Sequence, residues 1–248
     1  RGRRRRRPCP ASTAARQLDF WRHTLAGLPD AIDLPTDRPR PAEPTHRGAV
    51  MEFSVPAELH DGMRDLAHAG QASVFMVAHA ALTVLLHRLS HSDDIAIGTA
   101  VSGRGHAALD DLIGMFVGTL VLRTQVDPGA GFADLLSRTR DGDLAALDHG
   151  DLPFERIVEA LDPPRERGRH PLFQVALSLD DGALTEFALP GLHTTLEPVD
   201  VHVAKFDLQL TLAPQPDGGM RGVFTYATDL FDESTVRSFA HRYVRVLE

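Results

Sequence analysis

The stretch VFMVAHAALTVLLHRL, residues Val74 to Leu89, decides the fold class. It predicts a helix with Ser73 as its N-cap and with apolar side chains nearly all round, so this helix belongs inside a layered structure. The run is interrupted by His79 and Thr83. It is too short to span a bilayer, and it therefore predicts the central helix of a globular domain.

The expected strands share short runs of alternating apolar residues between turn signals. They are Val50–Val55, Asp94–Gly98, Phe116–Val126, Pro171–Leu179 and the strand that carries Phe206, Leu208, Leu210 and Leu212. The Asp217-Gly218-Gly219 turn then predicts a hairpin that returns through Arg221–Thr228.

Five further helices are expected from apolar spacing and from start signals. They cover Leu18–Leu28, Pro56–His68 and Phe132–Leu147, and two more follow Pro153 and the cap Asp232. Helices and strands are mixed without regular βαβ alternation. The sequence therefore predicts an α/β sandwich, in which helices pack on a mixed sheet.

Two segments are expected to lack regular structure. Residues 1–17 are predicted to be a disordered basic leader, because Arg1 and Arg3–Arg7 place six positive charges beside residues that offer nothing to pack. Without those six charges the net charge of −8 becomes −14, so the folded body is acidic and would repel nucleic acid. Residues 29–46 contain five prolines and are expected to form an extended connector across the surface.

The composition indicates a globular protein of the cytoplasm. Hydrophobic residues make up 43% of the chain and charged residues 24%, which is ordinary for such proteins. The single cysteine, Cys9, excludes an internal disulfide framework and a multi-thiolate metal site. No signal segment, membrane span, HExxH zinc motif or phosphate-cradling glycine loop is found, so neither a membrane partner nor a metal is expected.

Four segments resemble motifs of the condensation domains of nonribosomal peptide synthetases, and they occur in the order of that family. Phe20-Trp21 resembles its aromatic YxxYAxW helix, and IGMFVGTLVLR (Ile113–Arg123) is similar to IGxFVNTLxLR. HGDLPFE (His149–Glu155) is similar to HQDxPFE, and RHPLFQV (Arg169–Val175) matches RxPLFQV. Smaller similarities are DIAIGTAVSGR from Asp94, KFDL from Lys205 and YATDLF from Tyr226.

The resemblance implies a chloramphenicol acetyltransferase-like fold, in which two similar lobes form a V around the active site. Residues 18–248 would be the C-terminal lobe alone, a two-layer sandwich. The family's catalytic HHxxxDG motif lies in the other lobe, and no adjacent pair of histidines occurs in this chain. His106 to Asp110 has a similar spacing but the wrong position. We therefore expect no catalytic residue here, and no activity of the chain alone.

The family joins two thioesters, each carried on the phosphopantetheine of a carrier protein, into an amide. The resemblance implies carrier proteins, the N-terminal lobe and an adjacent adenylation domain as partners, with no cofactor bound directly by this chain. Five residues are candidates for the substrate channel: Arg104, Gly118, Thr119, Asp151 and Arg169. Gly118 replaces the family's Asn, which removes an amide group. Asp151 alternatively serves only to start a helix, and Arg169 only as a surface charge.

Two other functions remain open. An epimerization domain or another acyltransferase uses the same scaffold, although PLFQVALSL favours condensation because epimerization domains usually have an FNYLGQ-like segment there. The chain is alternatively a non-catalytic module that docks carrier proteins or a separate lobe.

Overall fold

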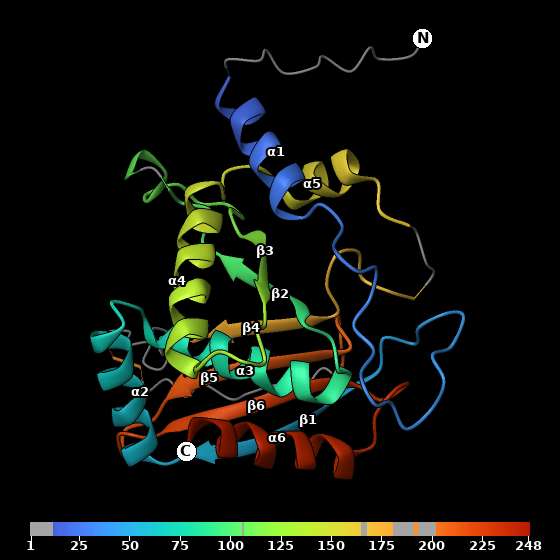
Figure 1. The fold of residues 1–248 in the computed structure, drawn as a ribbon. Coiled ribbons are helices and arrows are strands. Elements are labelled where there is room, and N and C mark those ends of the chain that lie inside the picture. Colours follow the sequence, from blue (N-terminus) through green and yellow to red (C-terminus); the bar gives the residue numbers. More distant parts are fainter. Residues whose placement is uncertain (1–11, 106, 165–167, 181–190, 193–201) are drawn as a thin grey trace.

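The computed structural model of the chain describes residues 12–105, 107–164, 168–180, 191–192 and 202–248 (Figure 1). In these residues it contains helices, strands and one short 3-10 helix, η1. Their order is α1 (Thr13–Thr24), β1 (Gly48–Val55), α2 (Ala57–Ala69), α3 (Val74–Ser90), β2 (Asp94–Val101), η1 (Ala107–Leu109), β3 (Gly118–Gln125), α4 (Phe132–Asp148), α5 (Phe154–Leu161), β4 (Val175–Leu179), β5 (Leu208–Pro214), β6 (Met220–Ala227) and α6 (Glu233–Leu247).

The strands form one mixed sheet in the order β1-β6-β5-β4-β2-β3. β4 runs parallel to both of its neighbours, β2 and β5, and the other pairs are antiparallel. The predicted hairpin is confirmed: Leu208 faces Tyr226 and Leu212 faces Gly222 across β5 and β6. The mixed α/β fold class predicted from the sequence is confirmed.

Helices α2, α3 and α6 cover one face of the sheet (Figure 1). The central helix is the buried one that the sequence predicts, because eleven of the 17 residues of α3 are buried. The hydroxyl of Ser73 accepts the N–H of Met76, so Ser73 is its N-cap as expected. The main core forms where α3 and α6 meet strand residues such as Ile97, Leu210 and Phe224, which are fully buried.

A second core lies at the β2–β3 end of the sheet, where α1 and α5 pack. Trp21 and Ile157 are fully buried there against Val121 and Phe173. The ring of Phe173 occupies the space where Gly98 has no side chain, since a Cβ at residue 98 would lie 2.0 Å from that ring. The two-layer arrangement therefore gains a third layer at this end alone.

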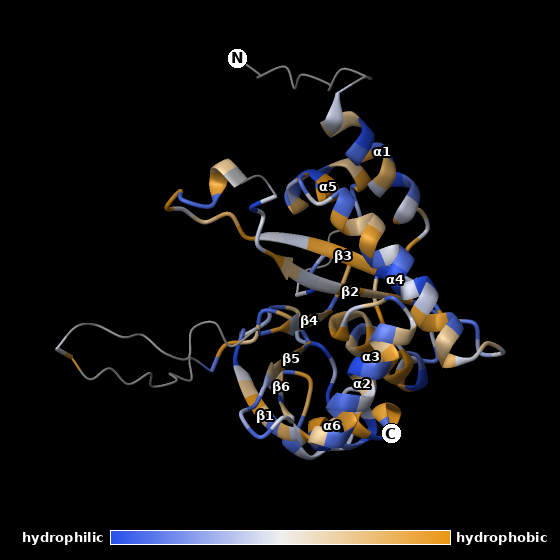
Figure 2. Ribbon diagram, turned by 90° about the vertical axis from the view of Figure 1, so that its left-hand side faces the viewer, coloured by the Kyte–Doolittle hydropathy of each residue, from blue (hydrophilic) through white to orange (hydrophobic). Residues whose placement is uncertain are grey.

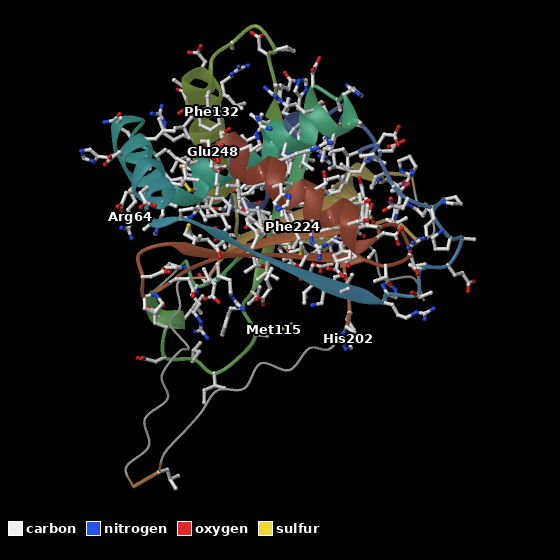
Figure 3. All side chains as sticks on the ribbon, turned by 90° about the horizontal axis from the view of Figure 1, so that it is seen from below. Arg64, Met115, Phe132, His202, Phe224 and Glu248 are labelled. Atoms are coloured by element: carbon white, nitrogen blue, oxygen red, sulfur yellow. The ribbon has the colours of Figure 1, made fainter. Side chains whose placement is uncertain are left out.

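The rest of the sheet surface opposite α2, α3 and α6 is here called the open face. It carries Ser178, Gln209, Thr211, Val223 and Thr225, all half-buried. Their registers place them side by side, with Gln209 opposite Thr225 and Thr211 opposite both Ser178 and Val223. Figure 3 shows Met115 and His202 on this side of the sheet, away from Arg64 of α2 and from Glu248, which directly follows α6.

Four elements begin at other residues than predicted. The first helix begins at Thr13 instead of Leu18, because Ser12 caps it and because Ala15 and Gln17 are buried. The predicted leader 1–17 therefore includes the first turn of this helix, and residues 1–11 lie outside the described part.

β4 begins at Val175 instead of Pro171, since proline has no N–H for the ladder and Leu172 has a φ of 69°. This bend also turns Phe173 into the second core, while Val175 and Leu177 belong to the first. The strand expected from Phe116 begins at Gly118, and the one expected from Phe206 begins at Leu208.

Candidate functional site

The loop between β2 and β3, described for residues 102–105 and 107–117 and including η1, is held at its base by Arg104. The guanidinium group donates hydrogen bonds to the carbonyl oxygens of Leu109 and Leu112 and lies over the ring of Phe116, 4.4 Å from its centroid. Gly103 closes the base with a φ of 61°, and a Cβ there would lie 1.8 Å from the carbonyl oxygen of Phe116. Arg104 is thus occupied in shaping the loop.

The far part of this loop carries exposed apolar side chains. Ile113 is fully exposed, Met115 is 92% exposed, and Leu112 and Val117 are at least half exposed. The loop projects from the sheet, with hydrophobic residues along its outer part (Figure 2). Contiguous apolar side chains that an ordered loop holds in water are typical of an interaction surface.

Gly118 and Thr119 open β3 directly after the loop. Gly118 faces Val101 and Thr119 faces Ala100 across the β2–β3 ladder. A Cβ at residue 118 would meet Val101 Cγ2 at 3.4 Å, an ordinary contact, so the backbone leaves room for the Cβ of the Asn in the similar motif. The half-buried Thr119 shares its face of the strand with Val121 and Arg123.

Asp151 lies between α1 and the same loop. Its carboxylate accepts a hydrogen bond from Gln17 Nε2 at 2.9 Å, and Gly105 approaches so closely that a Cβ there would be 3.6 Å from Asp151 Oδ1. Four of the five candidates, Arg104, Gly118, Thr119 and Asp151, therefore gather where the loop leaves the sheet.

His149 completes a clamp on α1. Its ring stacks on Phe20, with the centroids 3.9 Å apart and an angle of 9° between the planes. Its Nδ1 must donate to the carbonyl oxygen of Ala145, 2.8 Å away, because a carbonyl only accepts. Trp21 Nε1 in turn donates to the carbonyl oxygen of His149. The HGDLPFE segment thus positions the first helix of the lobe.

Arg123, the last residue of IGMFVGTLVLR, was not among the candidates although its motif position marked it. It forms a bidentate pair with Asp94, with N···O distances of 2.8 and 2.6 Å, and donates to the carbonyl oxygens of Thr24 and Ala26 at the end of α1. The hydrogen bond that Arg123 donates to the carboxylate of Asp94 raises the pKa of this arginine. Arg123 therefore joins β2, β3 and α1.

The polar residues of the remaining motifs hold residues 29–46, which contain neither helix nor strand, against the sheet. Gln174 is buried, accepts from the N–H of Ile32 at 3.0 Å and donates to the carbonyl oxygen of His170. Asp207 of KFDL pairs with Arg40 through both carboxylate oxygens. Asp229 of YATDLF accepts from the N–H and the hydroxyl of Thr45.

Arg169 lies apart from the other four candidates. It lines two hollows, one of about 700 Å³ between the end of α1 and α5, and one of about 360 Å³ beside the connector. His170 lines both as well, and burial lowers the pKa of this histidine. Its Nδ1 donates to the carbonyl oxygen of Phe173, and its ring packs against Phe154 and Phe206.

One histidine is poised against a carboxylate in a way that resembles a catalytic pair. His79 Nδ1 lies 3.0 Å from both oxygens of Asp143. Both residues are buried, and neither lines the two hollows described above. Without access for a substrate, the pair does not form an active site.

No cluster of three or more potential metal ligands occurs among the described residues. His60, which precedes an Asp-Gly pair in the sequence, is buried and its Nδ1 donates to the carbonyl oxygen of Gly218. His106, the first residue of the stretch His106–Asp110 that resembles HHxxxDG in its spacing, lies outside the described part.

No single helix among the described residues is long and apolar enough to cross a membrane. Helices α2 and α3 pass a test of length and apolar composition only as a pair, and this pair is bent by 105°.

Solved structures show the same fold. The X-domain from teicoplanin biosynthesis superposes with a TM-score of 0.89 and 34% identity, over 96% of this chain and 54% of that one. The same domain in complex with OxyB gives 0.86 at 33% identity, covering 96% and 53%. The four-domain nonribosomal peptide synthetase AB3403 gives 0.88 at 26% identity, covering 96% of this chain and 19% of that one. The fold is thus one lobe of the chloramphenicol acetyltransferase-like class.

Sequence comparison narrows this class to a family. The profile of the Condensation domain matches residues 10–248. A dimodular nonribosomal peptide synthase of Bacillus subtilis is 45% identical over 244 residues, and the probable non-canonical nonribosomal peptide synthetase CymA of Salinispora arenicola is 47% identical over 239. This chain belongs to the condensation domain family. It spans 10% and 3% of the length of those two relatives, and the match covers 96% of the chain in each case.

Proposed function

We propose that this chain forms one wall of a two-walled channel in which an amide bond is made between substrates carried by two carrier proteins. The observation that carries the proposal is the set of exposed apolar residues between η1 and β3, Leu112, Ile113, Met115 and Val117, which project on the side of the open face (Figure 2). Membership of the condensation domain family supports the chemistry. The opposite wall would be the N-terminal lobe with its HHxxxDG motif.

In the proposed reaction the amine nitrogen of the acceptor attacks the thioester carbonyl of the donor. The new C–N bond forms, the C–S bond breaks, and the amine proton leaves through the histidine of the other lobe to the departing thiolate. Two tethered substrates must be held in line for this attack, so positioning supplies much of the rate. This chain's contribution would be that positioning, with the polar open face, Gly118 and Thr119 beside the channel.

The proposed partners follow from the same arrangement. Carrier proteins would deliver both substrates on phosphopantetheine arms, which are part of the substrates and not a resident cofactor. The N-terminal lobe would cover Ile113, Met115 and Val117, and an adenylation domain would adjoin in the longer protein. A cytoplasmic location is part of the proposal. The chain alone would be inactive, since the buried histidine–carboxylate pair His79–Asp143 is inaccessible and the HHxxxDG motif would belong to the other lobe.

A non-catalytic docking module is the second candidate. One structure with the same fold is a complex of the teicoplanin X-domain with OxyB, a separate protein. Gly118 in place of the usual Asn also removes one polar group from the channel side. In this alternative the exposed loop would bind a partner without chemistry. An epimerization domain or another acyltransferase is less favoured, because PLFQVALSL stands where epimerization domains usually have an FNYLGQ-like segment.

A complementation assay tests the proposal. The chain is incubated with two loaded carrier proteins, alone and together with a separately produced N-terminal condensation lobe that contains HHxxxDG. We expect dipeptide only when both lobes are present, and none when the second histidine of HHxxxDG is replaced by alanine. Dipeptide formed by the chain alone would refute the two-walled channel. Binding of the lobe without any dipeptide would favour the docking module.

A further inference from the structure

A cluster of polar side chains is buried between α3 and α4, away from the open face. His79 and Thr83 lie one turn apart on α3, and Thr139 and Asp143 lie one turn apart on α4. The exposed fraction of each residue is at most 3%. Residues four apart share a helix face, so each helix presents two polar groups to the other.

The two helices are antiparallel at this contact. His79, near the start of α3, bonds to Asp143, near the end of α4. At the other end, His87 and Arg88 of α3 line the same surface hollow as Gly131 and Phe132 at the start of α4. This register puts Thr83 opposite Thr139, one turn away from the histidine–carboxylate pair.

The polar atoms of this cluster are not all satisfied by hydrogen bonds within the described part of the chain. A carboxylate only accepts, so the Nδ1 of His79 carries the proton that it donates to Asp143. His79 Nε2, Thr83 Oγ1 and Thr139 Oγ1 are buried and have no hydrogen-bond partner among the described residues. Buried polar atoms are nearly always satisfied in folded proteins, and three such atoms from facing helix turns point to one shared partner.

We propose that His79 Nε2 and the hydroxyls of Thr83 and Thr139 bind an internal water molecule. A water molecule has two donors and two acceptors and typically makes about three hydrogen bonds in such sites. It therefore fits the hydroxyls, which donate or accept, and an imidazole nitrogen in either role. The water joins α3 to α4, and α4 leads into the His149 clamp on α1. The site is independent of the proposed reaction.

A crystal structure of the chain, at a resolution that shows ordered water, tests the site directly. We expect one water within hydrogen-bond distance of all three atoms. A dry contact, or hydroxyls bonded to carbonyl oxygens of their own helices, would overturn the proposal whatever the activity of the protein.

Magnetic relaxation of solvent water, which counts long-lived internal waters, gives a second test in solution. We expect the double variant Thr83→Val with Thr139→Val to lose one such water and to unfold at lower denaturant concentration. Thr83→Ser keeps the hydroxyl and should keep the water. Thr124→Val removes a buried hydroxyl that is not among the unsatisfied ones and serves as the matched control. An unchanged water count in the double variant would contradict the site. If the double variant does not fold, the crystal structure described above decides by the presence or absence of the water.

Discussion

Trp21 Nε1 donates a hydrogen bond to the carbonyl oxygen of His149, 3.0 Å away and 128 residues further along the chain. This bond, the stacking of Phe20 on His149 and the contact of Gln17 with Asp151 place α1 firmly on the lobe. Trp21 is the only tryptophan of the chain and is fully buried, so its fluorescence reports on this docking.

Replacement of Trp21 tests the hydrogen bond and the packing together. Trp21→Phe removes the bond and part of the buried indole and should lower the free energy of unfolding by about 1–3 kcal/mol. Trp21→Ala also removes the buried ring and should lower it by about 3–5 kcal/mol. Urea denaturation followed by circular dichroism measures both. Equal effects of the two variants would show that α1 packs loosely.

Arg123→Met is expected to undock the end of α1. The side chain is 12% exposed and its loss leaves Asp94 and two carbonyl oxygens without their donor, which should destabilise the protein by roughly 3 kcal/mol. The fluorescence of Trp21 should shift to the red in the native baseline. Arg221→Met breaks a half-exposed pair with Glu52 and is the control, with an expected effect below about 1 kcal/mol. Similar losses of stability in both variants would contradict the role of Arg123 in docking the end of α1.

Substitution should be tolerated at Gly118 and should destabilise the protein at Gly98. Gly118→Asn restores the motif residue where only an ordinary contact with Val101 results, so the free energy of unfolding should change by no more than about 0.5 kcal/mol. Gly98→Ala forces a methyl group into the ring of Phe173 and should cost about 1–3 kcal/mol. Thermal unfolding of both variants checks this, and a harmless Gly98→Ala would mean that Phe173 moves aside easily.

Acid should loosen the connector before it unfolds the core. The N–H of Asp232 and the hydroxyl of Thr235 lower the pKa of Asp37, and the N–H of Thr45 lowers the pKa of Asp229. Because the pKa is lower in the folded state, these carboxylates stabilise the docked connector above roughly pH 4 and lose this effect as the pH falls through the folded pKa.

Amide hydrogen exchange in residues 37–45 measures that loosening. Exchange should accelerate below roughly pH 4 relative to the amides of α3, after correction for the intrinsic pH dependence. In the double variant Asp37→Asn with Asp229→Asn the pH dependence should be weaker. An identical acid response in the variant would assign the effect to other groups.

The exposed loop should make the isolated chain self-associate. Ile113 and Met115 are almost wholly in water, and an uncovered apolar surface favours association. Ile113→Asp with Met115→Ser should reduce association in sedimentation velocity without changing the thermal midpoint, since neither side chain packs in the lobe. A monodisperse monomer of the unmodified chain at high concentration would contradict this.

The sequence predicted the layers better than the polar contacts. Apolar periodicity identified the buried α3 and the β5–β6 hairpin, because burial repeats along a single element. The roles of Arg123 and Gln174 depend on partners about 100 and 140 residues away in the sequence, which no local pattern contains. Motif positions pointed to these residues without giving their function. The start of α1 was misplaced because the local cap signal of Ser12 was overlooked and because Gln17 bonds to Asp151, 134 residues further along the chain.

The bonds from Arg104 to the carbonyl oxygens of Leu109 and Leu112 have a consequence for assembly. The backbone freedom of the segment is largely removed when the lobe folds, so a partner that covers Ile113 and Met115 meets a surface already in its final shape. Less entropy is then lost at the encounter than with a flexible segment.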